Sequence, residues 1–392
     1  MTTIDTDLAL AALLDLDHPI KTATAEWAEG IFDADGVIER DDQSVFDAVG
    51  WQHCANRGIL GLRVPTEFGG RGLDLISALL TLEGLGKGCR DNGLTFAIAS
   101  QVWAIQGAIV RFGSDDQRRR WLPPMVAGSA LGSFAMTEPA SGSDSFAAQA
   151  TATRIDDVTW HLDGTKAHIT MGPRADVVLV FASTRPDAGR WGLSAFLVPT
   201  DLAGVTQHPN RAKMGMRTTP FGNIDFDGVR LEADTLVGRE GAGASIFAAA
   251  IESERAYLFA TSLGAMERQL DATVRYARER RQFGRPIGDF QAVSHRIADM
   301  KLRHESARLL LYKAALMEVT GRPVTDAAAM AKLATSEAGV ASGLDATMIH
   351  GALGYICDEG VERDLRDAIG GLVYSGTSDI QRTIISRFLG VG

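Results

Sequence analysis

The stretch Tyr374-Ser375-Gly376-Thr377-Ser378-Asp379-Ile380-Gln381-Arg382, near the end of the chain, is a Gly-Thr-Ser turn that leads into a helix. Ser378 and Gln381 have the spacing of a capping box, in which each side chain bonds to a free backbone N–H group of the first turn. The pattern predicts the last helix of the chain, which completes a helical C-terminal region.

Two apolar stripes precede this helix and predict a helical bundle. Helices in bundles bury one face, so apolar residues recur every three or four positions. The first stripe consists of Phe259, Leu263, Met266, Leu270, Val274 and Ala277. The second consists of Val293, Ile297, Met300, His304, Ala307, Leu311 and Ala314. His304 is the polar member, and we expect it to be partly buried and hydrogen-bonded.

Between about residues 126 and 236 the pattern changes to short β-rich segments bounded by Gly, Pro and Asp. Thr159 to Lys166 predicts a strand that runs into a tight Asp-Gly turn. Further strands are predicted over Val177–Phe181, Ser194–Val198 and Ile224–Phe226. This part of the chain is therefore expected to form a small β-barrel or sandwich.

Residues 1 to about 125 are expected to be helical, with helices over 25–28 and 44–49 and a glycine-rich loop over 69–72. The pair Pro123-Pro124 should end this region, because proline disrupts helices. The expected fold class is α+β. It divides into an N-terminal helical domain (1–125), a middle β domain (126–236) and a C-terminal four-helix bundle (237–392).

The composition narrows the class of protein. The 392 residues include 39 Lys and Arg against 49 Asp and Glu, a net charge of −10. Such a chain is a poor partner for nucleic acid or an anionic membrane. No run approaches the roughly 18 apolar residues of a membrane span, and Met1 to Leu16 lacks the basic segment of a signal peptide. The scattered cysteines, Cys54, Cys89 and Cys357, favour a reducing cytoplasm and no metal site.

Four segments resemble signatures of the acyl-CoA dehydrogenase family, whose members bind FAD. The first, Met136 to Asp144, is rich in small and hydroxyl residues, so its backbone can approach a ligand closely. In isolation it could equally be an ordinary loop. It resembles the family motif T-E-P-x-x-G-S-D. The resemblance implies that Met136 and Thr137 face the pyrimidine edge of FAD, and that Ser143 binds the flavin pyrophosphate or the pantetheine arm of the substrate.

The second segment, Gly164 to Thr170, resembles a strand that ends in W-I-T or W-I-S in the family. The resemblance places the Thr170 hydroxyl near flavin N5. His168 occupies the tryptophan position, which is a departure. It could widen the space beside the flavin, admit a polar substrate, or simply pack differently.

The third segment, Ala277 to Ile287, resembles the R-x-x-F-G pattern, and we expect its helix to end at Gly284. Clustered arginines usually form a solvated face. The resemblance instead implies that Arg280 binds the FAD pyrophosphate of a neighbouring subunit, with Phe283 beside the adenosine, since the guanidinium fork suits phosphate. Gln291 lies in a matching Q-A segment. The chain would then be a homo-oligomer, and the family implies a tetramer.

The fourth segment begins at Ile349 and includes Val361 to Asp367 and the terminal turn. It resembles the family patterns Q-I-x-G-G-x-G-Y, V-E-R-x-x-R-D and Y-E-G-T-S-x-I-Q. The resemblance implies cofactor contacts at Gly351, Thr377 and Asp379. Met348 and Ala352 replace a glutamine and a glycine, which weakens the expected contacts there.

The family commonly has a catalytic glutamate where this chain has Ser375. Dehydrogenation of a thioester needs a carboxylate base whose pKa is raised in a water-poor site. Some branches place the base in an E-R pair at the head of a helix, which implies Glu254 here, with Arg255 as a partner near the substrate. Glu252 is about 200° away around the helix and should point elsewhere. Ser375 keeps the backbone N–H that stabilises the enolate oxygen. The alternative for Glu254 is a surface glutamate in the first turn of a helix.

Residues 254 to 311 resemble the prolyl-carrier-protein dehydrogenases of secondary metabolism. This implies oxidation of a prolyl group, held by phosphopantetheine on a peptidyl carrier protein, to a pyrrolyl group. Three alternatives stay open: a dehydrogenase of free short or branched acyl-CoA, a flavin-dependent oxygenase, and a non-enzymatic binding protein. The electron acceptor could be a flavoprotein or oxygen.

Overall fold

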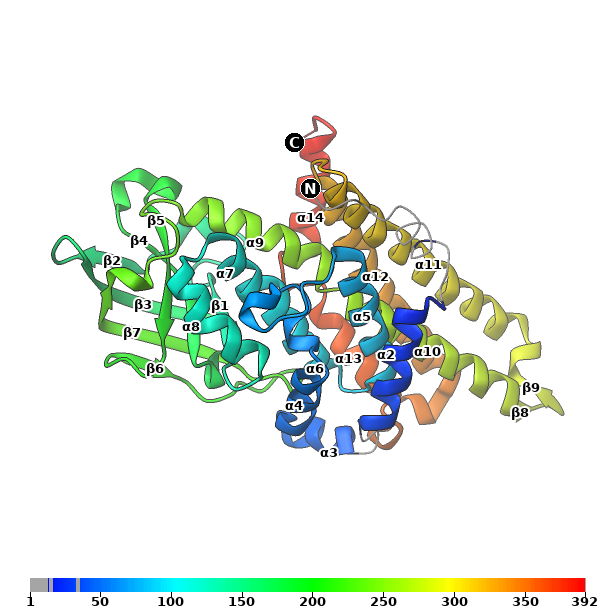
Figure 1. The fold of residues 1–392 in the computed structure, drawn as a ribbon. Helices are drawn as coiled ribbons and strands as arrows, with labels where there is room; N and C mark the ends of the chain where they lie inside the picture. Colours follow the sequence, from blue (N-terminus) through cyan, green and yellow to red (C-terminus); the bar gives the residue numbers. More distant parts are fainter. Residues whose placement is uncertain (1–12, 14–16, 33–35, 392) are drawn as a thin grey trace.

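The computed structural model describes residues 13, 17–32 and 36–391, so the expectation for Met1 to Leu16 falls almost wholly outside it. Figure 1 shows an elongated molecule with a β sheet at one end and a long helical hairpin at the other. The order of elements is helical, then β, then helical, which confirms the expected fold class.

The N-terminal helices come close to the expected pattern. They are α2 (Pro19–Ile31), α3 (Gly36–Gln43), α4 (Ala48–Asn56), α5 (Leu75–Gly88), α6 (Asn92–Ser100), the π-helix η3 (Gln101–Gln106), α7 (Gly107–Phe112) and α8 (Asp115–Val126). The prediction of a helix over 44–49 was wrong for its first part, because α4 begins after Asp47, whose side chain caps it.

The prediction that Pro123-Pro124 ends the helix was also wrong, since both lie inside α8. Proline lacks the N–H donor but keeps its carbonyl acceptor. The Pro123 carbonyl accepts from the N–H of Ala127 and the Pro124 carbonyl from that of Ser129, each at 3.0 Å, and α8 therefore continues to Val126.

The expectation that no apolar run is long enough to cross a membrane needs correction. The continuous helix Asn92–Phe112 passes that test by length and composition, with a mean hydropathy of 1.4. However, 83% of its apolar window is buried among other parts of the protein. An apolar helix that packs inside a large core has the same composition as a membrane span.

The middle region forms a seven-stranded sheet. Its strands are β1 (Gly132–Ala135), β2 (Thr151–Arg154), β3 (Thr159–Thr170), β4 (Val177–Ser183), β5 (Leu193–Pro199), β6 (Val205–Gln207) and β7 (Phe221–Glu232). The order is β1-β4-β2-β3-β7-β6, with β5 paired to β4 and with β1 and β4 parallel.

The predicted Asp-Gly hairpin turn is absent, because β3 runs through Asp163-Gly164 as a bulge against β7. Gly164 has φ 137°, and a Cβ at this position would lie 2.7 Å from that of Ala150. The glycine thus serves close approach between chain segments, and the hairpin pattern misled the prediction.

The C-terminal region is helical, and both predicted stripes face its interior. Its elements are α9 (Gly243–Tyr257), α10 (Ala260–Glu279), the short strands β8 (Arg281–Gln282) and β9 (Arg285–Pro286), α11 (Gln291–Val319), α12 (Thr325–His350), α13 (Val361–Gly370) and α14 (Ser378–Phe388). The helix predicted to end at Gly284 ends at Glu279, and β8 and β9 form a hairpin around Phe283 and Gly284, which both have positive φ.

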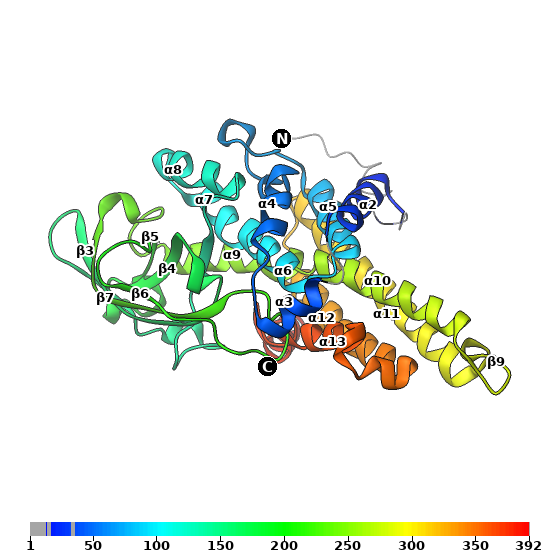
Figure 2. The same cartoon turned by 90° about the horizontal axis from the view of Figure 1, so that it is seen from below.

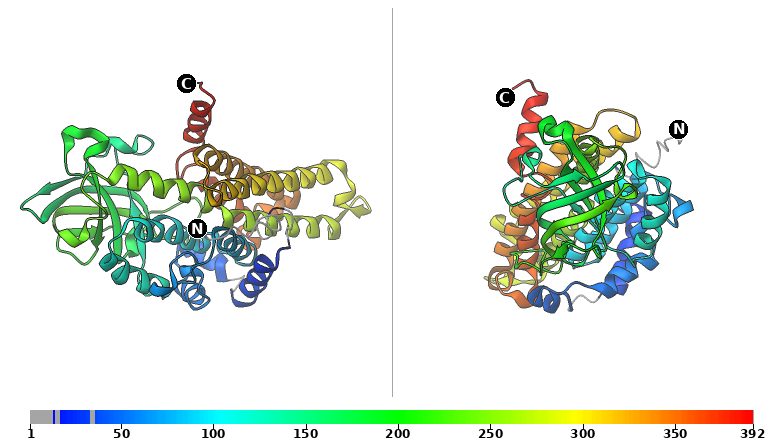
Figure 3. Two further views of the ribbon diagram at one scale, coloured as in Figure 1. Left: turned by 45° about the horizontal axis from the view of Figure 1, so that its top comes forward. Right: turned by 90° about the vertical axis from the view of Figure 1, so that its left-hand side faces the viewer.

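Helices from the two ends of the sequence share one core. In it α5 packs between α2 and α10, and α9 extends from β5 to α12 (Figures 2 and 3). His304 lies in this region and is 1% exposed, with no hydrogen-bond partner for either ring nitrogen in the described chain. His304 was expected to be partly buried and hydrogen-bonded. It is instead fully buried, and it lacks the expected hydrogen bond within the described chain. It lies close to Glu83 and Glu267, but the ammonium of Lys21 lies 2.5 Å from Glu267 and 3.4 Å from Glu83, where it would repel a metal cation.

Candidate active site

Glu254 and Ser375 are in direct contact although 121 residues separate them. The Ser375 hydroxyl donates a hydrogen bond of 2.7 Å to Oε1 of Glu254. Glu254 lies in the last turn of α9, not at the head of a helix as expected. The carbonyl end of a helix disfavours an anion. The position is therefore suited to a carboxylate that accepts protons.

Burial raises the pKa of Glu254, while the Ser375 hydroxyl and Arg255 lower it in part. The side chains of Glu252 and Glu254 point in different directions, as expected. Thr325 on α12 donates a hydrogen bond to Glu252, so this carboxylate points away from Ser375. Arg255 is buried, and its Nε has no partner in the described residues. The raised pKa and the half-buried position of Glu254 are the properties of a general base.

The turn that presents Ser375 is held rigidly. Ser375 and Gly376 have φ of 54° and 88°, and Gln381 Nε2 donates to both of their carbonyl groups, at 3.3 and 2.8 Å. In the described chain the N–H of Ser375 has no intramolecular acceptor. It is therefore free to donate to a ligand oxygen.

The predicted capping box was wrong by one residue. The N-cap of α14 is Thr377, whose Oγ1 accepts from the N–H of Ile380 at 3.2 Å. The hydroxyl of Ser378 is buried and unpartnered, and Gln381 bonds to the turn instead. The N-cap is the last residue outside the helix, and the conformation of the preceding turn decides which residue that is. Here the side chain of Gln381 bonds back to this turn, so Thr377 becomes the N-cap.

The Met136 to Asp144 segment begins where β1 ends, beside β3. Lys166 of β3 is fully buried, and its Nζ bonds to Oε1 of Glu138 at 2.7 Å and to the carbonyl of Met136 at 3.1 Å. The Glu138 carboxylate also accepts the N–H of Gln149 on Oε2 and the N–H of Ala150 on Oε1. This buried ion pair anchors the loop at both ends. Sequence reasoning assigned no role to Glu138 or Lys166.

Three hydroxyls at the expected flavin positions are free. The side chains of Thr137, Ser143 and Thr170 make no hydrogen bond within the described chain. Thr137 and Thr170 are half-buried at neighbouring strand ends, and Ser143 is exposed in the loop. Free hydroxyl groups of this kind can bond to the polar edge of a planar ring such as a flavin.

His168 lies at a bulge between β3 and β7 and has φ 60°. Its ring is exposed and stacks on Phe221, with ring centroids 5.8 Å apart. The side chain therefore has a packing role, and the special role beside the flavin stays a prediction.

The structure brings Thr377 to this site but leaves most of the remaining predicted residues exposed and away from it. Arg280 and Gln291 are exposed, and Phe283 is 93% exposed at the tip of the β8–β9 hairpin, at the opposite end of the molecule from the sheet (Figure 1). Gly351 ends α12 with φ 62° and is exposed, and Asp379 is an exposed residue in the first turn of α14. Thr377 is half-buried beside Ser375.

The fold is that of the acyl-CoA dehydrogenases, and the chain belongs to that family. Family models match along its length: the acyl-CoA dehydrogenase N-terminal domain over residues 20–129, the middle domain over 133–229 and the C-terminal domain over 241–390. The resemblance inferred from the motifs is thereby confirmed.

Among individual relatives, the L-prolyl-[peptidyl-carrier protein] dehydrogenase of Pseudomonas fluorescens is 44% identical over 344 residues, which cover 88% of this chain and 90% of that protein. A dehydrogenase of the same description from Serratia sp. is 38% identical, with coverage of 90% and 91%. The mitochondrial short-chain specific acyl-CoA dehydrogenase of Bos taurus is 37% identical, with coverage of 89% and 84%.

Solved structures with the same fold include proteins of similar description. The prolyl acyl carrier protein oxidase AnaB superposes with a TM-score of 0.92 at 38% identity, covering 95% of this chain and 98% of AnaB. PigA with FAD and proline superposes with a TM-score of 0.91 at 36% identity, covering 95% and 97%. The cofactor in that PigA structure is the one expected from the motifs.

Proposed function

We propose that this chain is an FAD-dependent dehydrogenase of acyl or aminoacyl thioesters, and that its substrate is an L-prolyl group on a phosphopantetheinylated carrier protein in secondary-metabolite biosynthesis. The observation that carries the proposal is the Glu254–Ser375 hydrogen bond. It restores a carboxylate to the region where Ser375 has lost one. The prolyl-specific relatives favour this substrate over free acyl-CoA.

Each of these residues has a separate role in the proposed reaction. Glu254 takes the proton from Cα of the thioester, because its pKa is raised by burial toward the working range of a base. The free N–H of Ser375 donates to the thioester oxygen, on which negative charge develops as the proton leaves. When bound, FAD supplies the acceptor for the hydride. Thr137, Thr170 and Ser143 are the residues that would hold it.

The contacts predicted for Arg280 and Phe283 would need a second copy of the chain. Arg280 and Phe283 lie far from Thr137 within one chain, so any role at the cofactor places them in a neighbour's site. This supports a homo-oligomer, with Gln291 at the same end, and the family favours a tetramer. Gly351, Asp379 and Arg255 stay proposed contacts of cofactor or substrate. A flavoprotein or oxygen is proposed as electron acceptor, and the cytoplasm as location.

The test uses purified enzyme with a carrier protein loaded with L-proline. Intact-protein mass spectrometry should detect the loss of two or four hydrogens from the prolyl group, and Glu254→Gln should abolish the loss. Bleaching of the flavin by butyryl-CoA, but not by the prolyl carrier, would favour the acyl-CoA alternative. Full turnover by Glu254→Gln would indicate an oxygenase, and colourless protein would indicate a binding role.

A further inference from the structure

The turn that carries Ser375 has a backbone conformation that is unfavourable for a serine. Ser375 has φ 54°, and Gly376 has φ 88°. Glycine adopts positive φ without a steric penalty, whereas the Cβ of a serine then approaches the following carbonyl oxygen. A residue other than glycine stays in this region only where the surrounding structure holds it, and such residues are concentrated at functional sites. The contacts that hold Ser375 therefore bear on its role.

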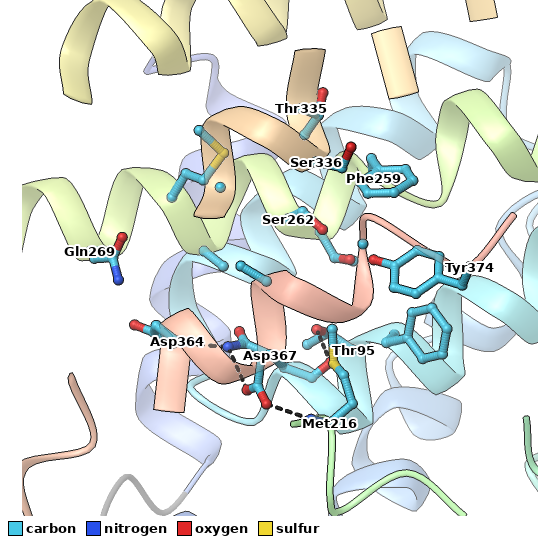
Figure 4. Close-up of a pocket in the computed structure, with 18 residues that line it drawn as sticks. Thr95, Met216, Phe259, Ser262, Gln269, Thr335, Ser336, Asp364, Asp367 and Tyr374 are labelled. Atoms are coloured by element: carbon cyan, nitrogen blue, oxygen red, sulfur yellow. Dashed lines mark hydrogen bonds between the residues drawn. The ribbon is translucent and has the colours of Figure 1, made fainter. Parts of the chain in front are cut away.

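The residues on either side of this pair are anchored by contacts of their own. The ring of Tyr374 packs against that of Phe259, with centroids 5.3 Å apart (Figure 4). At the other end the hydroxyl of Thr377 caps α14 by accepting the N–H of Ile380 at 3.2 Å. Neither contact involves a backbone group of the two residues between them, so the positive φ angles need another support.

That support is the side chain of Gln381. Its Nε2 donates to the carbonyl of Ser375 at 3.3 Å and to the carbonyl of Gly376 at 2.8 Å. Gln381 is fully buried, and a Cβ at position 376 would lie 2.7 Å from its Nε2, so this approach requires glycine. Oε1 has no partner in the described residues. The two carbonyl groups therefore fix the amide, because exchanging its oxygen and nitrogen would place an acceptor against two acceptors.

We propose that Gln381 is a positioning residue, which orients both the hydroxyl and the N–H of Ser375 by holding the turn. The inference rests on the proposed function, since Ser375 and Glu254 belong to that site. The hydroxyl donates to Glu254 at 2.7 Å, and the N–H is free for the thioester oxygen. Rotation about φ turns the N–H relative to the side chain, so one angle controls both groups. Gln381 has no hydrogen bond to Glu254 in the described chain and acts through Ser375.

Gln381→Met removes the donor and keeps a side chain of similar length, and it should change two features of the pH profile of kcat/KM. The acid limb should move to higher pH by up to about one unit, because the Ser375 hydroxyl lowers the pKa of Glu254. The alkaline plateau should fall by up to about 10²-fold, because the N–H is misplaced. Gly376→Ala should have the same two effects, since its Cβ displaces the amide, and it serves if Gln381→Met does not fold.

Two comparisons identify the route of the effect. Ser375→Ala keeps the N–H and should move the acid limb alone. In the double variant with Gln381→Met the limb should move no further, because the same bond is lost only once. Gln117→Met is the matched control: Gln117 is also buried in the first turn of a helix, and its Nε2 donates to the carbonyl groups of Asp234 and Leu236 at 2.7 and 3.0 Å. It should change neither feature.

A crystal structure of Gln381→Met gives a readout that does not depend on activity, and it should show that the Ser375–Glu254 bond is lost. A variant that keeps this bond and the positive φ of Ser375 overturns the proposal, as does a flavin-loaded variant whose profile equals that of Gln117→Met. A wild-type enzyme that oxidises butyryl-CoA but not the prolyl carrier refutes the proposed substrate, and the profile with butyryl-CoA then tests Gln381. Full turnover by Glu254→Gln refutes the base, and the crystal structure then decides the role of Gln381.

Discussion

Replacement of Ser375 by alanine tests whether the Ser375–Glu254 contact controls the base. The hydroxyl donates to Oε1 of Glu254 at 2.7 Å, and this bond favours the ionised carboxylate. A hydrogen bond to a charged group contributes about 1.5–3 kcal/mol. The lower part of this range applies, because both side chains are only partly buried. One pH unit corresponds to about 1.4 kcal/mol, so the expected change is about one unit.

The direction follows from which form the bond stabilises. Loss of a donor to the carboxylate raises the pKa of Glu254 further, so the base is protonated up to a higher pH. The acid limb of kcat/KM, measured as a pH profile with the prolyl carrier protein, should therefore move about one unit to higher pH. The plateau at alkaline pH should change little, because Glu254 is ionised there and the N–H of residue 375 remains.

Ser342→Ala is a suitable control, since its hydroxyl is buried and has no partner in the described chain. It should leave the acid limb in place. If Ser375→Ala lowers the plateau and leaves the acid limb unmoved, Glu254 is not the group whose ionisation limits the reaction, and the reasoning is refuted.

Three further outcomes are expected. Glu254→Gln should lower kcat by about 10²–10⁴-fold while its flavin spectrum is retained; unchanged kcat in a flavin-loaded variant contradicts the assignment of the base. Arg280→Ala should lower the FAD content of the purified protein, measured by absorbance, although Arg280 is remote from Thr137 in its own chain; full flavin content contradicts the intersubunit contact. Lys166→Met should lower the free energy of unfolding by about 3–5 kcal/mol, because it leaves the buried Glu138 carboxylate unpaired. Urea unfolding measures this, and the double variant with Glu138→Gln should be less destabilised than Lys166→Met alone.

Local patterns in the sequence predicted the parts of the molecule that depend on neighbours along the chain. The two apolar stripes of the C-terminal helices and the strands around Val177 and Ser194 follow from periodicity, because a residue's side of a helix or strand is set by its position in the repeat. The motifs also placed Glu254 and Ser375 among the candidates before any contact was known. Predictions failed where one local pattern is compatible with two structures. Pro123 could end a helix or lie within its last turn, and Gly164 could form a hairpin turn or a β-bulge.

What the sequence by itself determined is therefore the family, the order of elements and the types of residue available for catalysis. The tertiary structure decided which of them meet. It joined Glu254 to Ser375 across 121 residues, paired Lys166 with Glu138, placed Phe283 at the far tip and packed Phe96 against Tyr374. The physical reason is that helix and strand patterns are local, whereas these contacts depend on how distant segments pack into one core, and no repeat along the chain encodes that packing.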